Sequence, residues 1–390
     1  MTTTRSHILP IIVLAQFCCT SLWFASNAII QDLVQNFGLG PEAVSHLTSA
    51  VQFGFISGTL LFAILTITDR FSPSRVFLAC ALLGALCNAG LLWDGNTMVS
   101  LSGFRYFTGF FLAGIYPVGM KIAADYFDRG LGTSLGYLVG ALVLGTAFPH
   151  LLKTFDQSLS WENVVATTAL LAILGGSLLW VLVPNGPFRK KSQKLELSAF
   201  FKVFTIPEFR IAAFGYFGHM WELYAFWAFT PLLLTTFSTT YDSGYNVPLW
   251  SFLIIGIGGV ACVFGGYLSK KYGPKKTART ALLLSGGCCL LLPLVFLSGN
   301  IVLFLTFLIF WGMVVIADSP LFSTLVAQNA IPEFKGTALT IVNCIGFAIT
   351  IISIQVLGQL TQVSSSIWVF SILFLGPLFG VYHLFSKKTV

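Results

Sequence analysis

The sequence predicts an all-α polytopic membrane protein with twelve transmembrane helices in two pseudo-symmetric bundles of six. Three observations support this fold class: a strongly apolar composition, twelve apolar runs long enough to span a bilayer, and one basic turn that occurs twice. Both termini are predicted to be cytoplasmic.

The composition places most of the chain in contact with lipid. Hydrophobic residues make up 56% of the sequence, charged residues only 9%, and the mean hydropathy is +0.86. Soluble domains usually contain about 25% charged residues, so this chain could not solvate the surface of a soluble fold. We therefore expect a monomeric multi-pass protein of the cell (inner or plasma) membrane, with the lipid bilayer as a partner.

The twelve predicted spans are mostly apolar runs of about 20 residues, the length that a helix needs to cross the bilayer core. Short connections rich in Gly, Pro, Asn and Asp separate them. Their predicted ranges are 8–30, 44–66, 75–93, 98–122, 132–151, 163–183, 210–236, 248–268, 277–297, 301–326, 337–359 and 366–385. A long polar connection, 184–209, predicts three regions: an N-terminal bundle at 1–183, a cytoplasmic central loop at 184–209 and a C-terminal bundle at 210–390.

The positions of Lys and Arg predict the orientation. With both termini in the cytoplasm, 19 of the 21 basic residues lie on the cytoplasmic side, Lys153 lies outside and Arg105 lies within a span. Cytoplasmic loops of membrane proteins retain basic residues, which also explains the net charge of +7. Because the basic residues are scattered over short loops, we expect no nucleic-acid partner.

A basic turn follows the second span as Asp69–Arg75 and follows the eighth span as Lys270–Lys276, 201 residues later. The repeat extends further: Gly109 and Gly312 are 203 residues apart, and each precedes a proline by eight residues. A nearly constant offset indicates two similar halves, an architecture typical of secondary transporters.

This arrangement resembles the major facilitator superfamily over essentially the whole chain. The family signature between spans two and three reads roughly Gly-x-x-x-Asp-Arg-x-Gly-Arg-Arg. The residues that match it, or occupy its positions, are Asp69, Arg70 and Arg75 in the first copy and Gly266, Lys270, Lys271, Gly273 and Lys275 in the second. The first copy departs by Leu65 and Ser72 at the glycine positions, and the second by Lys270 at the acidic position.

The resemblance implies alternating access, in which two bundles rock about a central site near the bilayer midplane. It also implies that the turns act as a cytoplasmic gate, although a simple topology signal would explain them as well. Residues Arg105 to Gly109 look like the family's Arg-x-x-x-Gly element, whereas the Gly-Pro pair associated with proton-driven exporters is absent from the fifth span.

Ionisable residues deep in a span are costly and therefore candidates for function. Arg105 could contact substrate or take part in coupling, or it could bond to backbone carbonyls. Glu222 and His219 lie three residues apart on one helical face. A carboxyl group in low-dielectric surroundings and an imidazole can both exchange protons near neutral pH, which favours proton coupling. The alternatives are a static hydrogen-bonded pair, or a Glu222 permanently paired with Arg105.

Asp318 precedes Pro320, which bends a helix, so Asp318 could serve a gate or an ion site, or could simply reach the membrane interface. Further polar and aromatic side chains could line a central cavity or pack between helices. They are Gln16, Thr20, Trp23, Asn27, Gln52, Tyr137, Tyr216, Tyr224, Trp227, Asn343 and Gln355.

The expected function is secondary active transport of a small organic solute, anionic or zwitterionic, driven by a proton gradient. Export of amphipathic compounds is an alternative that the aromatic content suggests, and a membrane receptor without transport activity is another. We expect no enzyme activity, cofactor or metal. The eight cysteines lie inside apolar runs, and the phosphate-binding Gly-x-x-x-x-Gly-Lys-Ser/Thr motif is absent.

Overall fold

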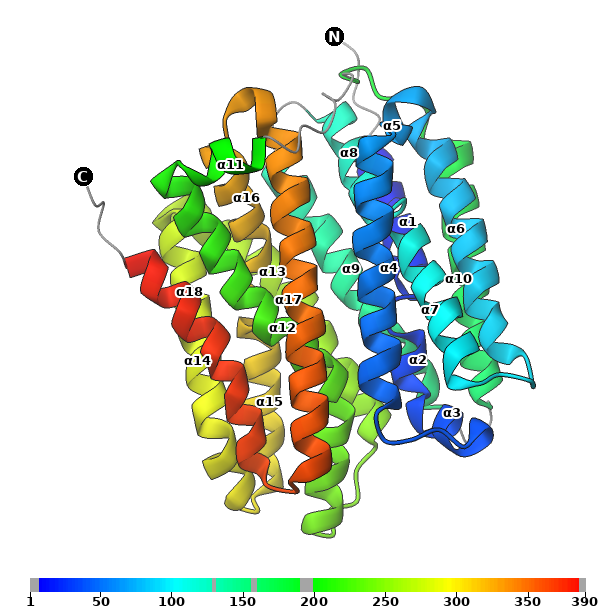
Figure 1. Cartoon of the computed structure of the whole chain (residues 1–390), viewed down its shortest axis with the longest axis vertical. Helices are drawn as coiled ribbons and strands as arrows, with labels where there is room; N and C mark the ends of the chain where they lie inside the picture. The colour runs from blue at the N-terminus through cyan, green and yellow to red at the C-terminus, as the bar shows by residue number, and fades with distance from the viewer. Residues whose placement is uncertain (1–6, 128–130, 156–159, 190–198, 386–390) are drawn as a thin grey trace. The chain divides into compact units, whose positions relative to one another are not determined.

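The computed structural model describes residues 7–127, 131–155, 160–189 and 199–385, and these residues form helices, turns and connections without a strand. The chain divides into two compact units, unit 1 (residues 1–195) and unit 2 (residues 196–390) (Figure 1). The two chain ends fall outside the described residues, so their cytoplasmic placement stays a prediction.

Unit 1 consists of helices that are joined by short connections. They are α1 (Ile8–Thr20), α2 (Ala25–Ala28), α3 (Ile30–Phe37), α4 (Ala43–Ile64), α5 (Ile67–Arg70), α6 (Pro73–Ala89), the 3-10 helix η1 (Gly90–Leu92), α7 (Met98–Leu112), α8 (Tyr116–Tyr126), α9 (Leu131–Lys153) and α10 (Trp161–Leu182). Figure 1 shows α5 at the same end of unit 1 as α8.

Unit 2 is built in the same manner from fewer, longer helices. They are α11 (Ala199–Phe204), α12 (Pro207–Thr240), α13 (Val247–Tyr272), α14 (Pro274–Leu297), α15 (Ile301–Val314), α16 (Ser319–Asn329), the 3-10 helix η2 (Pro332–Phe334), α17 (Lys335–Val363), the 3-10 helix η3 (Ile367–Phe374) and α18 (Leu375–Phe385).

Among the described residues, ten helical segments are long and apolar enough to cross a membrane, and α1 is a shorter apolar helix. The structure therefore confirms an all-helical multi-pass fold. The remaining predicted span, 210–236, lies within α12, a 34-residue helix that carries His219 and Glu222. The count of twelve spans stays a prediction.

The two units pack corresponding helices in the same order. In unit 1, α1 contacts α8, α9 and α10, while α6 contacts α7, α8 and α10. In unit 2, α12 contacts α16, α17 and α18, while α14 contacts α15, α16 and α18. Helix α12 thus has the same set of neighbours in unit 2 as α1 has in unit 1, and α14 has the same set as α6. The sequence repeat is therefore also a structural repeat.

Two glycines bring helices into close contact at equivalent positions of the units. A Cβ atom on Gly109 would clash with the carbonyl oxygen of Val51, and one on Gly312 would clash with that of Ile254. Both members of the second pair follow those of the first by 203 residues. Only glycine allows the α4–α7 and α13–α15 backbones to approach this closely.

Three predicted spans differ from the expected continuous helices. Span 98–122 is divided into α7 and α8, span 301–326 into α15 and α16, and span 8–30 is interrupted after α1. Pro117 and Pro320 occupy the second position of α8 and α16, where a missing N–H is tolerated but the helix cannot continue from the preceding turn. The breaks expose backbone carbonyls inside the membrane region, and these need partners.

Candidate functional site

A buried carboxylate on α12 is the first part of the candidate site. Glu222 is 1% exposed, and it accepts a hydrogen bond from Trp311 Nε1 at 2.6 Å and one from Ser285 Oγ at 2.9 Å. Cys289 Sγ lies 3.4 Å from its Oε1 as a third, weaker donor. Three donors from α14 and α15 thus hold the carboxyl group of Glu222 inside unit 2.

A buried acid–imidazole pair lies at the break between α15 and α16. His219 Nδ1 on α12 is 2.8 Å from Asp318 Oδ1, and both side chains are 1% exposed. Their outer atoms, His219 Nε2 and Asp318 Oδ2, are buried without a hydrogen-bond partner among the described residues. Buried polar atoms are rarely left in this condition, which is typical of a site that takes up a proton, a water molecule or a solute.

His219 connects the two buried acids of unit 2. It lies three residues before Glu222 on one face of α12, and its Nδ1 is 2.8 Å from Asp318 Oδ1. The structure therefore brings three predicted residues, His219, Glu222 and Asp318, into one buried cluster, which we call the unit 2 acid cluster. It pairs His219 with Asp318 rather than with Glu222.

Arg105 on α7 has its partners within unit 1. It is fully buried, donates from Nη1 to Asn88 Oδ1 at 3.1 Å and from Nη2 to the carbonyl of Leu22 at 3.0 Å. Nη2 also donates to the carbonyl of Trp23. Leu22 and Trp23 lie in the break after α1, so Arg105 satisfies carbonyls that the break releases. This geometry favours the structural alternative for Arg105 over substrate contact.

The polar face predicted on the first span is divided by the same break. Thr20 donates to the carbonyl of Gln16 in its own helix, and Asn27 donates to Thr48 on α4 at 2.7 Å. Trp23 packs on Phe55 with ring centroids 4.9 Å apart. For Asn27 and Trp23, these contacts favour packing between helices over a role in lining a cavity.

Two other buried amide side chains lack such partners in the described part of unit 1. Gln16 on α1 and Gln52 on α4 are fully buried, and neither amide has a hydrogen-bond partner among the described residues. A Cβ on Gly119 would clash with the side-chain oxygen of Gln16, so that amide lies against the backbone of α8. An amide can bind a carboxylate or a hydroxyl group of a solute.

The remaining cavity candidates lie mainly on α12 and α17. Tyr216 donates its hydroxyl to Asn343 at 2.7 Å, and its ring centroid lies 6.0 Å from that of His219. The Tyr224 ring packs 5.3 Å from the buried Trp227. Tyr137 on α9 is 38% exposed and Gln355 on α17 is partly buried. Tyr216 and Asn343 are thus neighbours of the unit 2 acid cluster.

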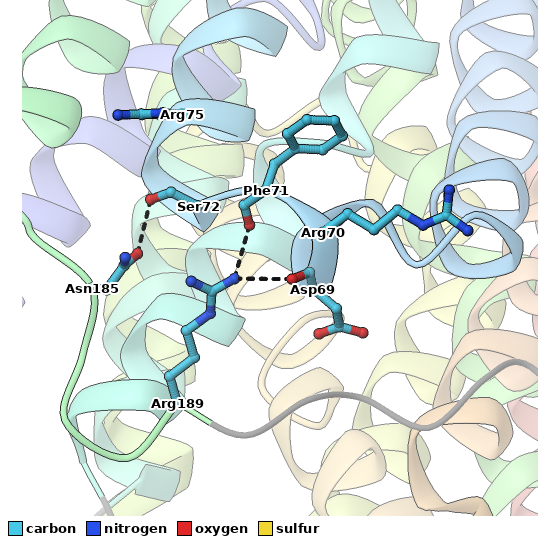
Figure 2. A pocket seen from close by; sticks show the side chains of 7 residues that line it. All are labelled: Asp69, Arg70, Phe71, Ser72, Arg75, Asn185 and Arg189. Atoms are coloured by element: carbon cyan, nitrogen blue, oxygen red, sulfur yellow. Dashed lines mark hydrogen bonds between the residues drawn. The ribbon is translucent and has the colours of Figure 1, made fainter.

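The first basic turn is bound to its own unit by several contacts. Asp69 Oδ1 lies 3.7 Å from Lys121 Nζ on α8. Arg189 Nη2 donates to the carbonyls of Asp69 at 3.3 Å and Phe71 at 2.9 Å (Figure 2). It also donates to the carbonyl of Thr68 at 3.1 Å. Ser72, at a position where the family signature has glycine, has a φ of −61°, a value that any residue adopts. The backbone at Ser72 therefore does not require the glycine of the family signature.

The second basic turn holds three of its four lysines against tyrosine rings. Lys270 Nζ lies 5.1 Å from the ring centroid of Tyr267, and Lys271 Nζ lies 5.1 Å from that of Tyr272. Gly273 joins α13 to α14 with a φ of +83°, a backbone conformation that favours glycine. At Gly266 a Cβ would meet open space, and Lys275 is exposed.

Several residues that complete these sites were not among the candidates. Asn88 could have been found, because it is a polar residue within an apolar span. Trp311, Ser285 and Cys289 carry no such signal, since Trp, Ser and Cys are common in apolar helices.

Comparison with known proteins identifies the family. The family model of the Major Facilitator Superfamily matches residues 12–354, most of the chain. The chain belongs to the major facilitator superfamily. It is therefore a multi-pass membrane transporter and not an enzyme.

One curated relative of this major facilitator protein is the benzoate transport protein of Acinetobacter baylyi (strain ATCC 33305 / BD413 / ADP1). It is 20% identical over 315 residues, which are 70% of this chain and 66% of the relative's length. The chain thus spans slightly less than two thirds of that protein.

Solved structures show the same fold at low sequence identity. The xylose transporter XylE from E. coli, in a partially occluded inward-open conformation, matches with a TM-score of 0.77 at 14% identity over 98% of both chains. A mutant of the nucleoside transporter NupG matches with a TM-score of 0.71 at 15% identity over 97% of both chains. At these identities the likeness concerns the fold alone.

Proposed function

We propose that the protein is a proton-coupled transporter of a small organic anion or zwitterion that works by alternating access. The observation that carries this proposal is the unit 2 acid cluster of His219, Glu222 and Asp318, in which all three groups are buried. An acid that is buried among a few donors, beside a second acid, can load and release one proton per cycle.

Two observations support an anionic solute: the unpartnered amides in the described part of unit 1, and the name of one relative. The buried amides of Gln16 and Gln52 lack protein partners among the described residues, and amide N–H groups bind carboxylates. The name of the Acinetobacter baylyi relative specifies benzoate, a carboxylate with an apolar ring. The coupled proton would compensate the charge of such a solute during translocation.

The first experiment identifies the solute class. Benzoate, xylose and uridine are each added to the purified protein, and the apparent unfolding temperature is measured, because a ligand that binds only the folded state raises it. We expect benzoate or a related carboxylate to stabilise the protein. Stabilisation by xylose or uridine alone would reject the anionic class, and stabilisation by lipophilic cations alone would favour export of amphipathic compounds.

The second experiment tests the coupling in proteoliposomes with an imposed pH gradient, using radiolabelled benzoate. We expect Glu222→Gln and Asp318→Asn to lose the stimulation of transport by the gradient, while exchange of solute between the two sides continues. The control is Glu162→Gln, an exposed acid in the first turn of α10. If Glu222→Gln keeps the pH dependence of the wild type, Glu222 is not the coupling acid.

A further inference from the structure

The surface of unit 1 contains an arginine-lined pocket of about 540 Å³ beside the first basic turn. The residues that line it are Asp69, Arg70, Phe71, Ser72, Arg75, Asn185 and Arg189. Three arginines from three different segments thus surround one carboxylate. Lys121 lies 3.7 Å from Asp69 Oδ1 and 3.8 Å from Asp125 Oδ1, so two carboxylates and one lysine stand beside the three arginines. Four cations against two acids leave the surroundings of the pocket positive.

The Arg189 guanidinium is held in a fixed orientation at this pocket. Its Nη2 donates to the carbonyls of Thr68, Asp69 and Phe71 at 3.1, 3.3 and 2.9 Å. In the view of Figure 2 the other terminal nitrogen points to the side on which Asn185 and Ser72 lie. Those two residues are joined by a 2.8 Å hydrogen bond from the Ser72 hydroxyl to Asn185 Oδ1.

Arg75 lies on the same side of the pocket in Figure 2, whereas Arg70 lies on the opposite side. Arg75 is exposed and belongs to the first turn of α6, which begins at Pro73. Arg75 and Arg189 both line the pocket, so an anion bound in it would be offered two guanidinium groups, which bind phosphate oxygens in a planar, bidentate manner. Arg70 would add attraction from the other side.

The surroundings of the pocket indicate a lipid-borne phosphate rather than a soluble one. Phe71, which lines the pocket, is 57% exposed, and Phe188, next to Arg189, is 45% exposed. The apolar surface continues along the end of α10, where Val181 is 68% exposed. A positive pocket at the boundary of a lipid-facing surface fits a phosphate headgroup whose acyl chains lie against the neighbouring helices.

We propose that this pocket binds the phosphate of an anionic phospholipid headgroup, in contact with Arg75 and Arg189. The site belongs to unit 1 alone and is independent of the solute and of the coupling proton. The second basic turn does not reproduce it, because three of its four lysines, Lys270, Lys271 and Lys276, lie against the rings of Tyr267 and Tyr272.

The test measures lipid binding to the full chain in detergent by native mass spectrometry. Phosphatidylglycerol is titrated against phosphatidylcholine for the wild type, for Arg75→Gln and for Lys276→Gln. Lys276 is the matched control, because it follows Arg75 by 201 residues and also belongs to the first turn of its helix. We expect Arg75→Gln to weaken the tightest phosphatidylglycerol binding by roughly tenfold, and Lys276→Gln to leave it unchanged.

Three outcomes would overturn the proposal. The first is equal binding of phosphatidylglycerol by the wild type and Arg75→Gln. The second is an equal loss in Lys276→Gln, which would indicate general surface charge. The third is competition of inorganic phosphate with the lipid at similar concentrations, which would indicate a site for a soluble anion. Unfolding temperatures in pure phosphatidylcholine, equal for all variants, would show that the substitutions leave the fold intact.

Discussion

Unit 1 buries the cation of Arg105 on α7, whereas unit 2 buries Glu222 and Asp318 beside His219, although the helices of the two units pack in the same order. Unit 1 also buries Asp125 and His150, near the ends of α8 and α9. Arg105 in unit 1 donates to one side chain and two backbone carbonyls, all of which are fixed acceptors. Its counterpart 203 residues later is Leu308, which is also fully buried. In unit 2 the buried imidazole and carboxyl side chains among the described residues are His219, Glu222 and Asp318.

The difference separates a structural charge from a titratable one. Arginine remains protonated under ordinary conditions and satisfies backbone groups released by a helix break. An imidazole group changes charge near neutral pH, and a carboxyl group can do so where its surroundings favour the neutral acid. We infer that the two units share their helix packing, and we propose that the coupling proton binds in unit 2.

Replacing Arg105 tests most directly whether the buried charge of unit 1 is structural. Arg105→Gln should leave Asn88 Oδ1 and the carbonyls of Leu22 and Trp23 without their donor, at a cost of about 1–3 kcal/mol for each buried acceptor. We expect a large fall in unfolding temperature and in abundance. The pH dependence of transport in the folded fraction should match the wild type, and a changed pH profile would place Arg105 in the coupling mechanism.

A smaller effect is expected at the glycine crossings that the units share. In Gly109→Ala and Gly312→Ala the new methyl group would clash with a backbone carbonyl, and such overpacking costs about 1–3 kcal/mol. Both variants should unfold at lower temperature by similar amounts. Gly103→Ala on α7 is the control, because a Cβ there meets open space. Unequal shifts would show that the two crossings are not equivalent.

The smallest effect on stability is expected at the basic turns. Asp69→Asn removes an ion pair with Lys121 whose closest atoms are 3.7 Å apart, and Lys121 keeps Asp125 as a partner at 3.8 Å. Unfolding temperatures of Asp69→Asn and Lys270→Asn should therefore stay near that of the wild type. We expect Asp69→Asn to slow solute uptake into proteoliposomes more than Lys270→Asn, because an ion pair can open and close during the cycle. Full activity in both variants would reduce the turns to topology signals.

The sequence by itself determined the fold class and the repeat. Long apolar runs report burial in lipid, and the spacing of Gly109 and Gly312 reports two similar halves, because both depend on local composition and order. The ionisable candidates could also be found in this way, since a charged residue is conspicuous within an apolar span.

The tertiary structure decided what these residues contact. Trp311 is 89 residues from Glu222, and Leu22 is 83 residues from Arg105, so no local pattern joins them. The same holds for His219, which lies three residues from Glu222 in the sequence but is paired with Asp318. Hydrogen-bond partners inside a helical bundle are selected by which helices pack together and where those helices break, and both are properties of the assembled unit.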